Sequence, residues 1–84
     1  MTTWRTLIAQ EMLDRDEKWG DVVAHTFVGH ELDAPFDEGF GASEGCPLTL
    51  WTTHRVYFPV QYDGSEWCAS VSRNPDGRRT DHVG

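Results

Sequence analysis

The sequence predicts a small α+β domain, in which one N-terminal helix packs on an antiparallel β-meander of three to four strands to give two layers. Three observations lead to this fold. Apolar residues near the N-terminus recur at spacings of three and four, as on one face of a helix. Residues 56–62 and 65–71 alternate apolar and polar side chains. Between these two runs lies Asp63-Gly64, a strong signal for a two-residue hairpin.

The helix is expected from about Thr3 to Asp14. Thr2 or Thr3 can cap its first turn, since threonine side chains accept hydrogen bonds from backbone N–H groups there. The acid-rich run DRDEKWGD ends the helix, with Gly20 as a breaker. The apolar stripe consists of Trp4, Leu7, Ile8 and Met12.

The segment that follows is less regular. Residues 22–27 (VVAHTF) fit either a strand or a helical turn, and their β-branched content favours an edge strand. His30 to Ala34 are expected to form one helical turn before Pro35. The loop from Asp37 to Gly45 contains GFGASEG, which superficially resembles a phosphate-binding loop. Because it precedes a proline and a strand instead of a helix, a plain connection is the preferred interpretation.

The turn at Asp63-Gly64 sets the register of the hairpin. It pairs Tyr62 with Ser65, and this register gathers the apolar residues of both strands on one face, which we expect to lie under the helix. Pro59 predicts that its strand is not hydrogen-bonded on both sides at that point. The expected apolar pairs are Val60–Trp67, Phe58–Ala69 and Val56–Val71. The expected pairs on the other face are Gln61–Glu66, Pro59–Cys68 and Tyr57–Ser70.

The strand before the hairpin is expected over Pro47 to Thr52. A three-residue loop, Thr53 to Arg55, would place Trp51 beside Tyr57 on the polar face. A two-residue loop would turn Trp51 to the apolar side instead. We favour the three-residue loop, because it directs Leu48 and Leu50 into the core.

The composition fits one domain over residues 1–84, with 38% hydrophobic and 25% charged residues. A core this small is thin, so a homodimer stays open as an additional source of stability. The N-terminus has no basic start followed by an apolar run, and no apolar stretch approaches the length of a membrane span. We therefore expect a cytoplasmic protein without membrane contact.

The net charge of −7 lies entirely in the first half of the chain. Residues 1–50 contain ten acids and three basic residues, whereas residues 51–84 contain four acids and four arginines. Non-specific nucleic-acid binding is therefore not expected, because its affinity comes from neutralising phosphates. A basic partner, or a small anion held by a few arginines, fits this charge distribution.

No catalytic, metal or cofactor site is predicted. The histidines, His25, His30, His54 and His82, lack the spacing of a metal motif. Cys46 and Cys68 are expected as two reduced thiols, since no export signal is seen. Cys68 and Ser70 lie within a strand, where nucleophiles are seldom presented.

The polar face of the meander is the candidate binding site. Its Trp and Tyr rings offer surfaces for stacking, and its arginines offer bidentate donors for phosphate or carboxylate. The alternative is a second small core under the loop 33–45, with Phe36 and Phe40 on the two aromatic rings. The tail from Ser72 either frays or folds back and brings arginine to the site. The predicted ligand-binding residues are Trp51, His54, Arg55, Tyr57, Ser70 and Arg73.

Several stretches resemble a group of small accessory proteins, mostly without assigned function, encoded by bacteriophages and prophages. The resemblance extends over nearly the whole chain and is most distinctive in LWT (50–52), VYFP (56–59), YDGSEW (62–67) and RNPDG (73–77). It implies a short soluble phage protein acting in the cytoplasm of a bacterial host. It implies no active-site residues.

Phage accessory proteins of this size often antagonise host defences by binding. The favoured function is therefore non-catalytic capture of a small nucleotide-like signal on the aromatic and arginine face. The alternative is an acidic inhibitor or DNA mimic that covers a basic site on a host defence protein, of the anti-CRISPR or anti-restriction type. A small hydrolase is the weakest of the three hypotheses.

Overall fold

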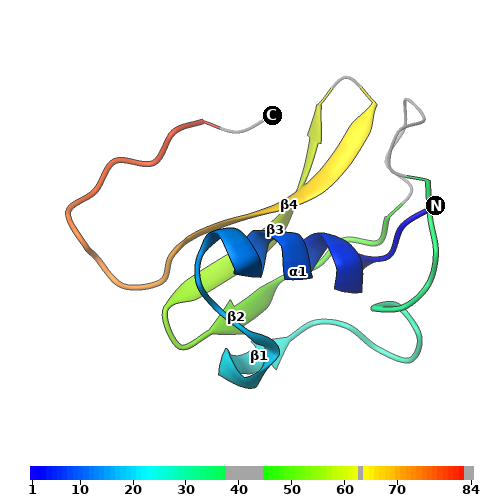
Figure 1. Ribbon diagram of the computed structural model, residues 1–84, viewed down its shortest axis with the longest axis horizontal. Helices are drawn as coiled ribbons and strands as arrows, with labels where there is room; N and C mark the ends of the chain where they lie inside the picture. Colours follow the sequence, from blue (N-terminus) through cyan, green and yellow to red (C-terminus); the bar gives the residue numbers. More distant parts are fainter. Residues whose placement is uncertain (38–44, 63, 83–84) are drawn as a thin grey trace.

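The computed structural model describes residues 1–37, 45–62 and 64–82. One helix packs on one face of a four-stranded antiparallel sheet with the strand order β1-β2-β3-β4 (Figure 1). This confirms the predicted α+β fold. The elements are α1 (Trp4–Asp14), the short 3₁₀ helix η1 (Trp19–Asp21), β1 (Val22–His25), β2 (Leu50–Thr52), β3 (Arg55–Tyr62) and β4 (Ser65–Ser72).

Helix α1 begins and ends close to its predicted bounds. Thr3 is the N-cap, and its Oγ1 accepts a hydrogen bond from the backbone N–H of Thr6 at 3.2 Å. After the helix, Asp16 adopts a positive φ of 58°, which turns the chain back toward the sheet. The predicted stripe is the buried face of the helix: Trp4, Leu7, Ile8 and Met12.

The β3–β4 hairpin has the predicted register at every pair from Tyr62–Ser65 to Val56–Val71, and Arg55–Ser72 extends it by one pair that was not predicted. Gly64 has a φ of 84°, a conformation that the hairpin turn requires and that glycine adopts without steric cost. Pro59 lies beyond the short stretch of β3 that pairs with β2, so its missing N–H costs no ladder bond there.

The prediction of which sheet face lies under the helix is wrong. The sheet residues that join the core with α1 are Leu50, Tyr57 and Cys68. Tyr57 and Cys68 come from the face expected to be polar, whereas Leu50 was expected in the core. The more apolar face points away from α1, and we call it the open face. On β2, β3 and β4 the open face consists of Trp51, Val56, Phe58, Val60, Tyr62, Ser65, Trp67, Ala69 and Val71.

The turn between β2 and β3 has two residues, Thr53 and His54, so the predicted three-residue loop is also wrong. Leu50 pairs with Tyr57, and Trp51 pairs with Val56. The Oγ1 atom of Thr52 accepts hydrogen bonds from the N–H groups of Arg55 at 2.9 Å and His54 at 3.3 Å, which stabilises the tight turn.

The segment of residues 22–27 contains the predicted edge strand. Strand β1 pairs antiparallel with β2 through a bulge between Val22 and Ala24. The expected helical turn at residues 30–34 is not a helix: residues 29–33 form turns, in which the N–H of Asp33 donates to the backbone carbonyl of His30 at 3.0 Å. The strand expected from Pro47 begins only at Leu50.

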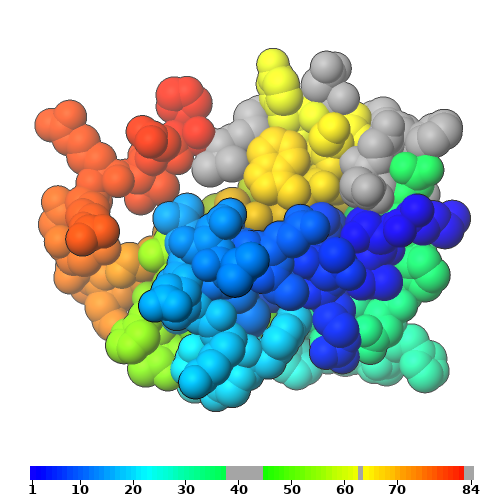
Figure 2. Space-filling model, viewed as in Figure 1, coloured from blue at the N-terminus to red at the C-terminus, as the bar shows by residue number. Residues whose placement is uncertain are grey.

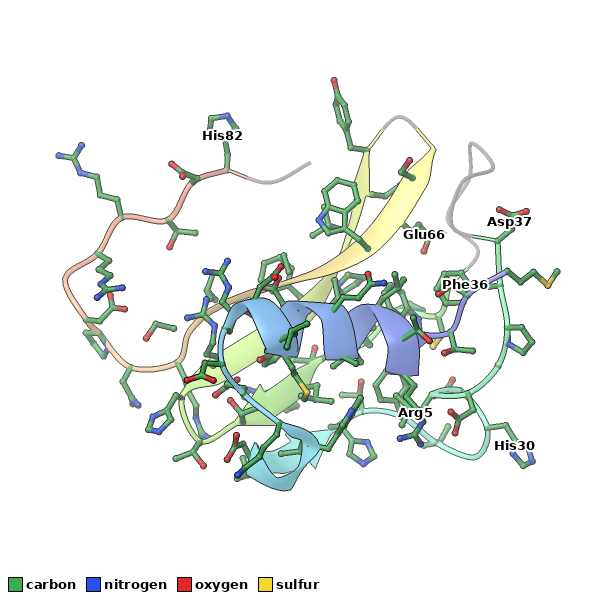
Figure 3. The ribbon with its side chains drawn as sticks, viewed as in Figure 1. Arg5, His30, Phe36, Asp37, Glu66 and His82 are labelled. Carbon is green, nitrogen blue, oxygen red and sulfur yellow. The ribbon has the colours of Figure 1, made fainter. Side chains whose placement is uncertain are left out.

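The N-terminal end of α1 is tied to the segment before the undescribed loop. Phe36 packs on Trp4 with ring centroids 5.0 Å apart and belongs to the core cluster that contains Tyr57, whereas Trp51, its other expected partner, lies outside that cluster. Phe40, its expected companion, lies outside the described residues. Arg5 points from α1 toward the turn that carries His30 (Figure 3), and its Nε donates to Asp33 at 2.6 Å.

Candidate functional site

A polar network joins the C-terminal half of α1 to the covered face of the sheet. The hydroxyl of Ser70 donates to a carboxylate oxygen of Glu11 at 2.7 Å, and Arg55 donates to the Ser70 hydroxyl from Nε at 2.7 Å. Arg55 Nη2 also donates to the backbone carbonyl of Ser70 at 2.9 Å. The same Glu11 oxygen accepts from Arg15 Nε at 3.0 Å. Two arginines are thereby positioned on either side of one carboxylate.

The carboxylate of Glu17, which follows the end of α1, is also hydrogen-bonded to the covered face of the sheet. Glu17 accepts a hydrogen bond from the Tyr57 hydroxyl at 2.5 Å and from the Thr52 hydroxyl at 2.9 and 3.0 Å. Charge-assisted bonds of this length are among the stronger ones in proteins. They stabilise the turn after α1 against β2 and β3.

Tyr57 is part of the core and offers no surface to a ligand. Its side chain is fully buried, at 0% exposure. Burial, and then the hydrogen bond to Glu17, raise the pKa of Tyr57 far above its usual range. The ring supports the sheet, and the hydroxyl stays protonated as a donor to Glu17.

The predicted site residues divide into three groups. Arg55, Tyr57 and Ser70 lie together on one face of the sheet, as the register predicts, but this face lies beneath α1, which was not expected. Trp51 is half-buried on the open face, separated from Tyr57 by the thickness of the sheet. The prediction that the two rings share a surface is therefore wrong, because the two-residue turn reverses the orientation of Trp51.

The remaining predicted site residues belong to the β2–β3 turn. His54 is exposed in the turn itself. Arg73 donates from its backbone N–H to the carbonyl of His54 at 2.8 Å, and from Nη1 to the carbonyl of Thr52 at 2.9 Å. Arg73 thus holds the turn against the end of β4.

Two adjoining cavities open beside the polar network. The larger, of about 470 Å³, lies between the segment after α1, His54 and the tail, and the other, of about 350 Å³, lies between β4 and the tail. Figure 2 shows the hollow between the orange tail and the rest of the molecule. Both cavities are lined by Arg15, Arg55, Ser72, Asp76 and Arg78.

The cavity along β4, which we call the β4 cavity, combines arginines with one indole ring. Its charged lining comprises four arginines and three acids, in a chain whose net charge is −7. Trp67 lines it as well and is half-buried. The tail therefore brings arginine to the site, one of the two behaviours expected for it. The charged residues are Glu11, Arg15, Arg55, Asp76, Arg78, Arg79 and Asp81.

Three arginines of the β4 cavity, Arg55, Arg78 and Arg79, have guanidinium N–H groups that are available to a ligand. Arg55 uses Nε and one Nη nitrogen in its bonds to Ser70. In residues 1–37, 45–62 and 64–82, no hydrogen bond or ion pair engages the guanidinium of Arg78 or Arg79. An arrangement of fixed and uncommitted guanidinium groups can bind a phosphate or carboxylate through several N–H donors.

Sequence reasoning missed Glu11, Arg15, Glu17 and Trp67 as site residues. The sequence analysis named neither glutamate as a site residue, and it placed Trp67 among the apolar pairs expected under the helix. A sequence signal exists only for Arg15, which follows Glu11 by four residues, the spacing of a helical ion pair.

In the described residues, the structure gives little support to metal binding or to catalysis by a thiol. Those ranges contain no group of three or more His, Cys, Asp or Glu residues that could hold a metal ion. Cys46 and Cys68 are not bonded to each other, as expected for reduced thiols. Burial raises the pKa of the Cys68 thiol to about 12, so it is not a nucleophile near neutral pH.

Comparison of the chain with models of known protein families, with curated proteins and with solved structures found no significant match. The one α-helix in the described part of the chain is too short to span a bilayer.

Proposed function

We propose that this is a non-catalytic binding protein that captures a small, anionic, nucleotide-like ligand in the β4 cavity. The observation that carries the proposal is the lining of this cavity by four arginines and one tryptophan. A cavity of about 350 Å³ falls within the range of small-molecule sites.

Each part of the ligand has a matching protein group. The indole of Trp67 offers a flat apolar surface for a base, and base–aromatic stacking contributes about 1–3 kcal/mol. Arg15 and Arg55 are held in place by Glu11 and Ser70, so little side-chain entropy is lost when they bind phosphate. Arg78 and Arg79 close the opposite wall from the tail.

The biological setting that we propose is antagonism of a bacterial defence, supported by the resemblance to phage accessory proteins. Withholding a nucleotide signal from a host immune effector requires binding and no turnover. The expected phenotype is that expression of the protein restores plaque formation on a strain whose defence uses such a signal. A variant without ligand binding should fail to restore it.

The direct test is a thermal-shift scan against mononucleotides, cyclic nucleotides and cyclic dinucleotides, followed by calorimetry on any hit. A ligand at about 100 times its dissociation constant stabilises the fold by roughly 2.7 kcal/mol. At ~4–8 °C per kcal/mol, the midpoint should rise by about 10 °C or more. A flat response over the whole panel would contradict the proposal.

Matched arginine variants locate the site. Arg78→Ala and Arg79→Ala lie in the exposed tail and should leave the fold intact, yet each should weaken binding by roughly tenfold, since hydrogen bonds to charged groups contribute about 1.5–3 kcal/mol. Arg5→Ala is the control, because Arg5 is an exposed, paired arginine at the other end of the molecule. Equal affinity in all three variants would exclude the β4 cavity.

The alternative function, an acidic protein-binding inhibitor or DNA mimic, would rest on fewer acidic side chains. Glu17 is engaged by Tyr57 and Thr52, so its reversal would disturb the fold and test nothing else. Asp14 and Asp16 are exposed beside it. Asp14→Asn and Asp16→Asn should leave nucleotide binding unchanged and would abolish activity only under the alternative.

A further inference from the structure

The two cavities beside the polar network share one wall. Among the residues that line both are three arginines, Arg15, Arg55 and Arg78. Trp67 lines only the β4 cavity, whereas His54 lines only the larger one, which we call the turn cavity. The joined space therefore has an aromatic ring toward each end and arginines between the two rings.

The two rings are well separated along the sheet. Trp67 and Ser72 both belong to β4, and the five steps of chain between them correspond to about 17 Å of strand. Ser72 pairs with Arg55, and His54 directly precedes Arg55 in the β2–β3 turn. One nucleoside monophosphate cannot contact both rings while its phosphate stays on the shared arginines, whereas two nucleosides joined through phosphate can.

The imidazole of His54 is available as a second stacking surface. The turn that carries it is held through the backbone, because the N–H of His54 donates to Thr52 Oγ1 and its carbonyl accepts from the N–H of Arg73. The side chain is exposed, and in the described part of the chain no hydrogen bond engages its ring. Histidine is among the aromatic residues on which proteins stack unpaired bases.

The charges of the turn cavity indicate what lies beyond the shared arginines. Of the described residues that line this cavity alone, three are carboxylates and none is lysine or arginine. A further phosphate placed there would be repelled. Hydroxyl and amino groups of a ribose or a base would instead find hydrogen-bond acceptors. The anionic part of the ligand is therefore central, and the end in the turn cavity is uncharged. The three carboxylates are those of Asp16, Glu17 and Asp21.

We propose that the ligand is a dinucleotide, whose two nucleosides, joined through phosphate, extend from Trp67 to His54. This inference rests on the proposed function, since it concerns the same cavity and the same arginines. Arg55 and Arg78 bind the phosphate that joins the nucleosides. One base stacks on the indole in the β4 cavity, and the other stacks on the imidazole in the turn cavity. A nucleoside triphosphate fits less well, because it has one base and its further phosphates would approach the carboxylates.

Titration calorimetry of the wild-type chain with matched ligands tests the inference. For each of the four bases, the probes are the 5′-monophosphate, the 5′-triphosphate, the linear 3′→5′ dinucleotide and the cyclic dinucleotide. All are compared at one pH and about 150 mM salt, where long-range charge effects are screened beyond about 8 Å. At least one dinucleotide should bind about fivefold or more tightly than the monophosphate of the same base, as one further stacked base requires. The triphosphate should show no such gain.

Substitution of each ring separates the two ends of the site. His54→Ala should weaken binding of the dinucleotide to the level of the monophosphate and leave the monophosphate unchanged. Trp67→Ala should weaken both ligands. His30→Ala is the matched control, because His30 is an exposed histidine on the side of the molecule away from the tail (Figure 3), and its change should affect neither ligand.

The outcomes distinguish this inference from the proposed function. Monophosphates that bind as tightly as dinucleotides, or a triphosphate that binds best of all, would overturn the dinucleotide while the β4 cavity remained a nucleotide site. Unchanged dinucleotide affinity in His54→Ala would overturn it as well. If none of the compounds bound to the wild-type chain, the proposed function itself would be wrong, and the dinucleotide with it.

Discussion

The Tyr57 hydroxyl donates to the carboxylate of Glu17 at 2.5 Å from within the core. We expect Tyr57→Phe to lower the free energy of unfolding by about 1.5–3 kcal/mol, because a hydrogen bond to a charged group is lost while the ring remains. Urea denaturation followed by circular dichroism measures this difference. Nucleotide affinity should be unchanged when tested well below the unfolding transition.

Tyr62→Phe is the control for this prediction. Tyr62 is 62% exposed near the tip of the same hairpin, and its change should alter stability by less than about 0.5 kcal/mol. Equal stability of both variants would mean that the bond to Glu17 does not form in solution.

The Cys68 thiol is 4% exposed beneath α1, and burial is the main cause of its raised pKa. At pH 8 we expect a thiol reagent to label Cys68 at least 100-fold more slowly in the native protein than in guanidinium, because the thiolate is the reactive form. Mass spectrometry of digested protein distinguishes it from Cys46. Labelling of Cys68 at its unfolded rate would show that the helix does not cover it.

The raised pKa of the Cys68 thiol predicts that the fold loses stability at high pH. The pKa of Cys68 is raised from 9.0 in the unfolded chain to about 12 in the fold. Its contribution to stability is therefore fully present below pH 9 and is lost as pH rises toward 12. Cys68→Ala should flatten this alkaline part of the stability profile, whereas Cys46→Ala, at a more exposed thiol, should flatten it less.

At the scale of elements, Gly45 lets the chain pass between α1 and β4. A Cβ at this position would lie 2.7 Å from Cζ2 of Trp4 and 2.9 Å from Oε2 of Glu66. Both side chains are almost fully buried and cannot move freely. We expect Gly45→Ala to lower the free energy of unfolding by about 1–3 kcal/mol, the usual cost of overpacking.

Gly20→Ala is the matched control, because its Cβ would have no atom within 4 Å and its φ is not positive. Chemical denaturation of both variants compares them under identical conditions. If Gly45→Ala were as stable as Gly20→Ala, the close approach of Trp4 and Glu66 would not exist in solution.

The hairpin and the helix were predictable because their signals are local. The turn at Asp63-Gly64 fixes which residues pair, and two independent alternating runs agree on one register. The stripe of α1 needs only the helical period. Both sheet faces carry apolar side chains, however, so alternation could not decide which one α1 covers.

The candidate site was only partly predictable because its contacts are remote in sequence. Ser70 and Glu11 are 59 residues apart, and Tyr57 and Glu17 are 40 apart. These carboxylates satisfy the hydroxyls of the covered face, so a partly polar face can lie under a helix. The prediction assumed that the more apolar face packs under the helix, and it did not consider that carboxylates could accept hydrogen bonds from the hydroxyls of the other face.

At the scale of the whole molecule, the β4 cavity and the open face meet along strand β4. The β4 cavity opens between β4 and the tail, whereas the centre of the open face lies on the other side of the sheet from α1. Trp67, Ala69 and Val71 belong both to the open face and to the lining of the cavity. The apolar edge of the open face and the four arginines therefore line one cavity, as the proposed ligand with its base and its anionic group requires.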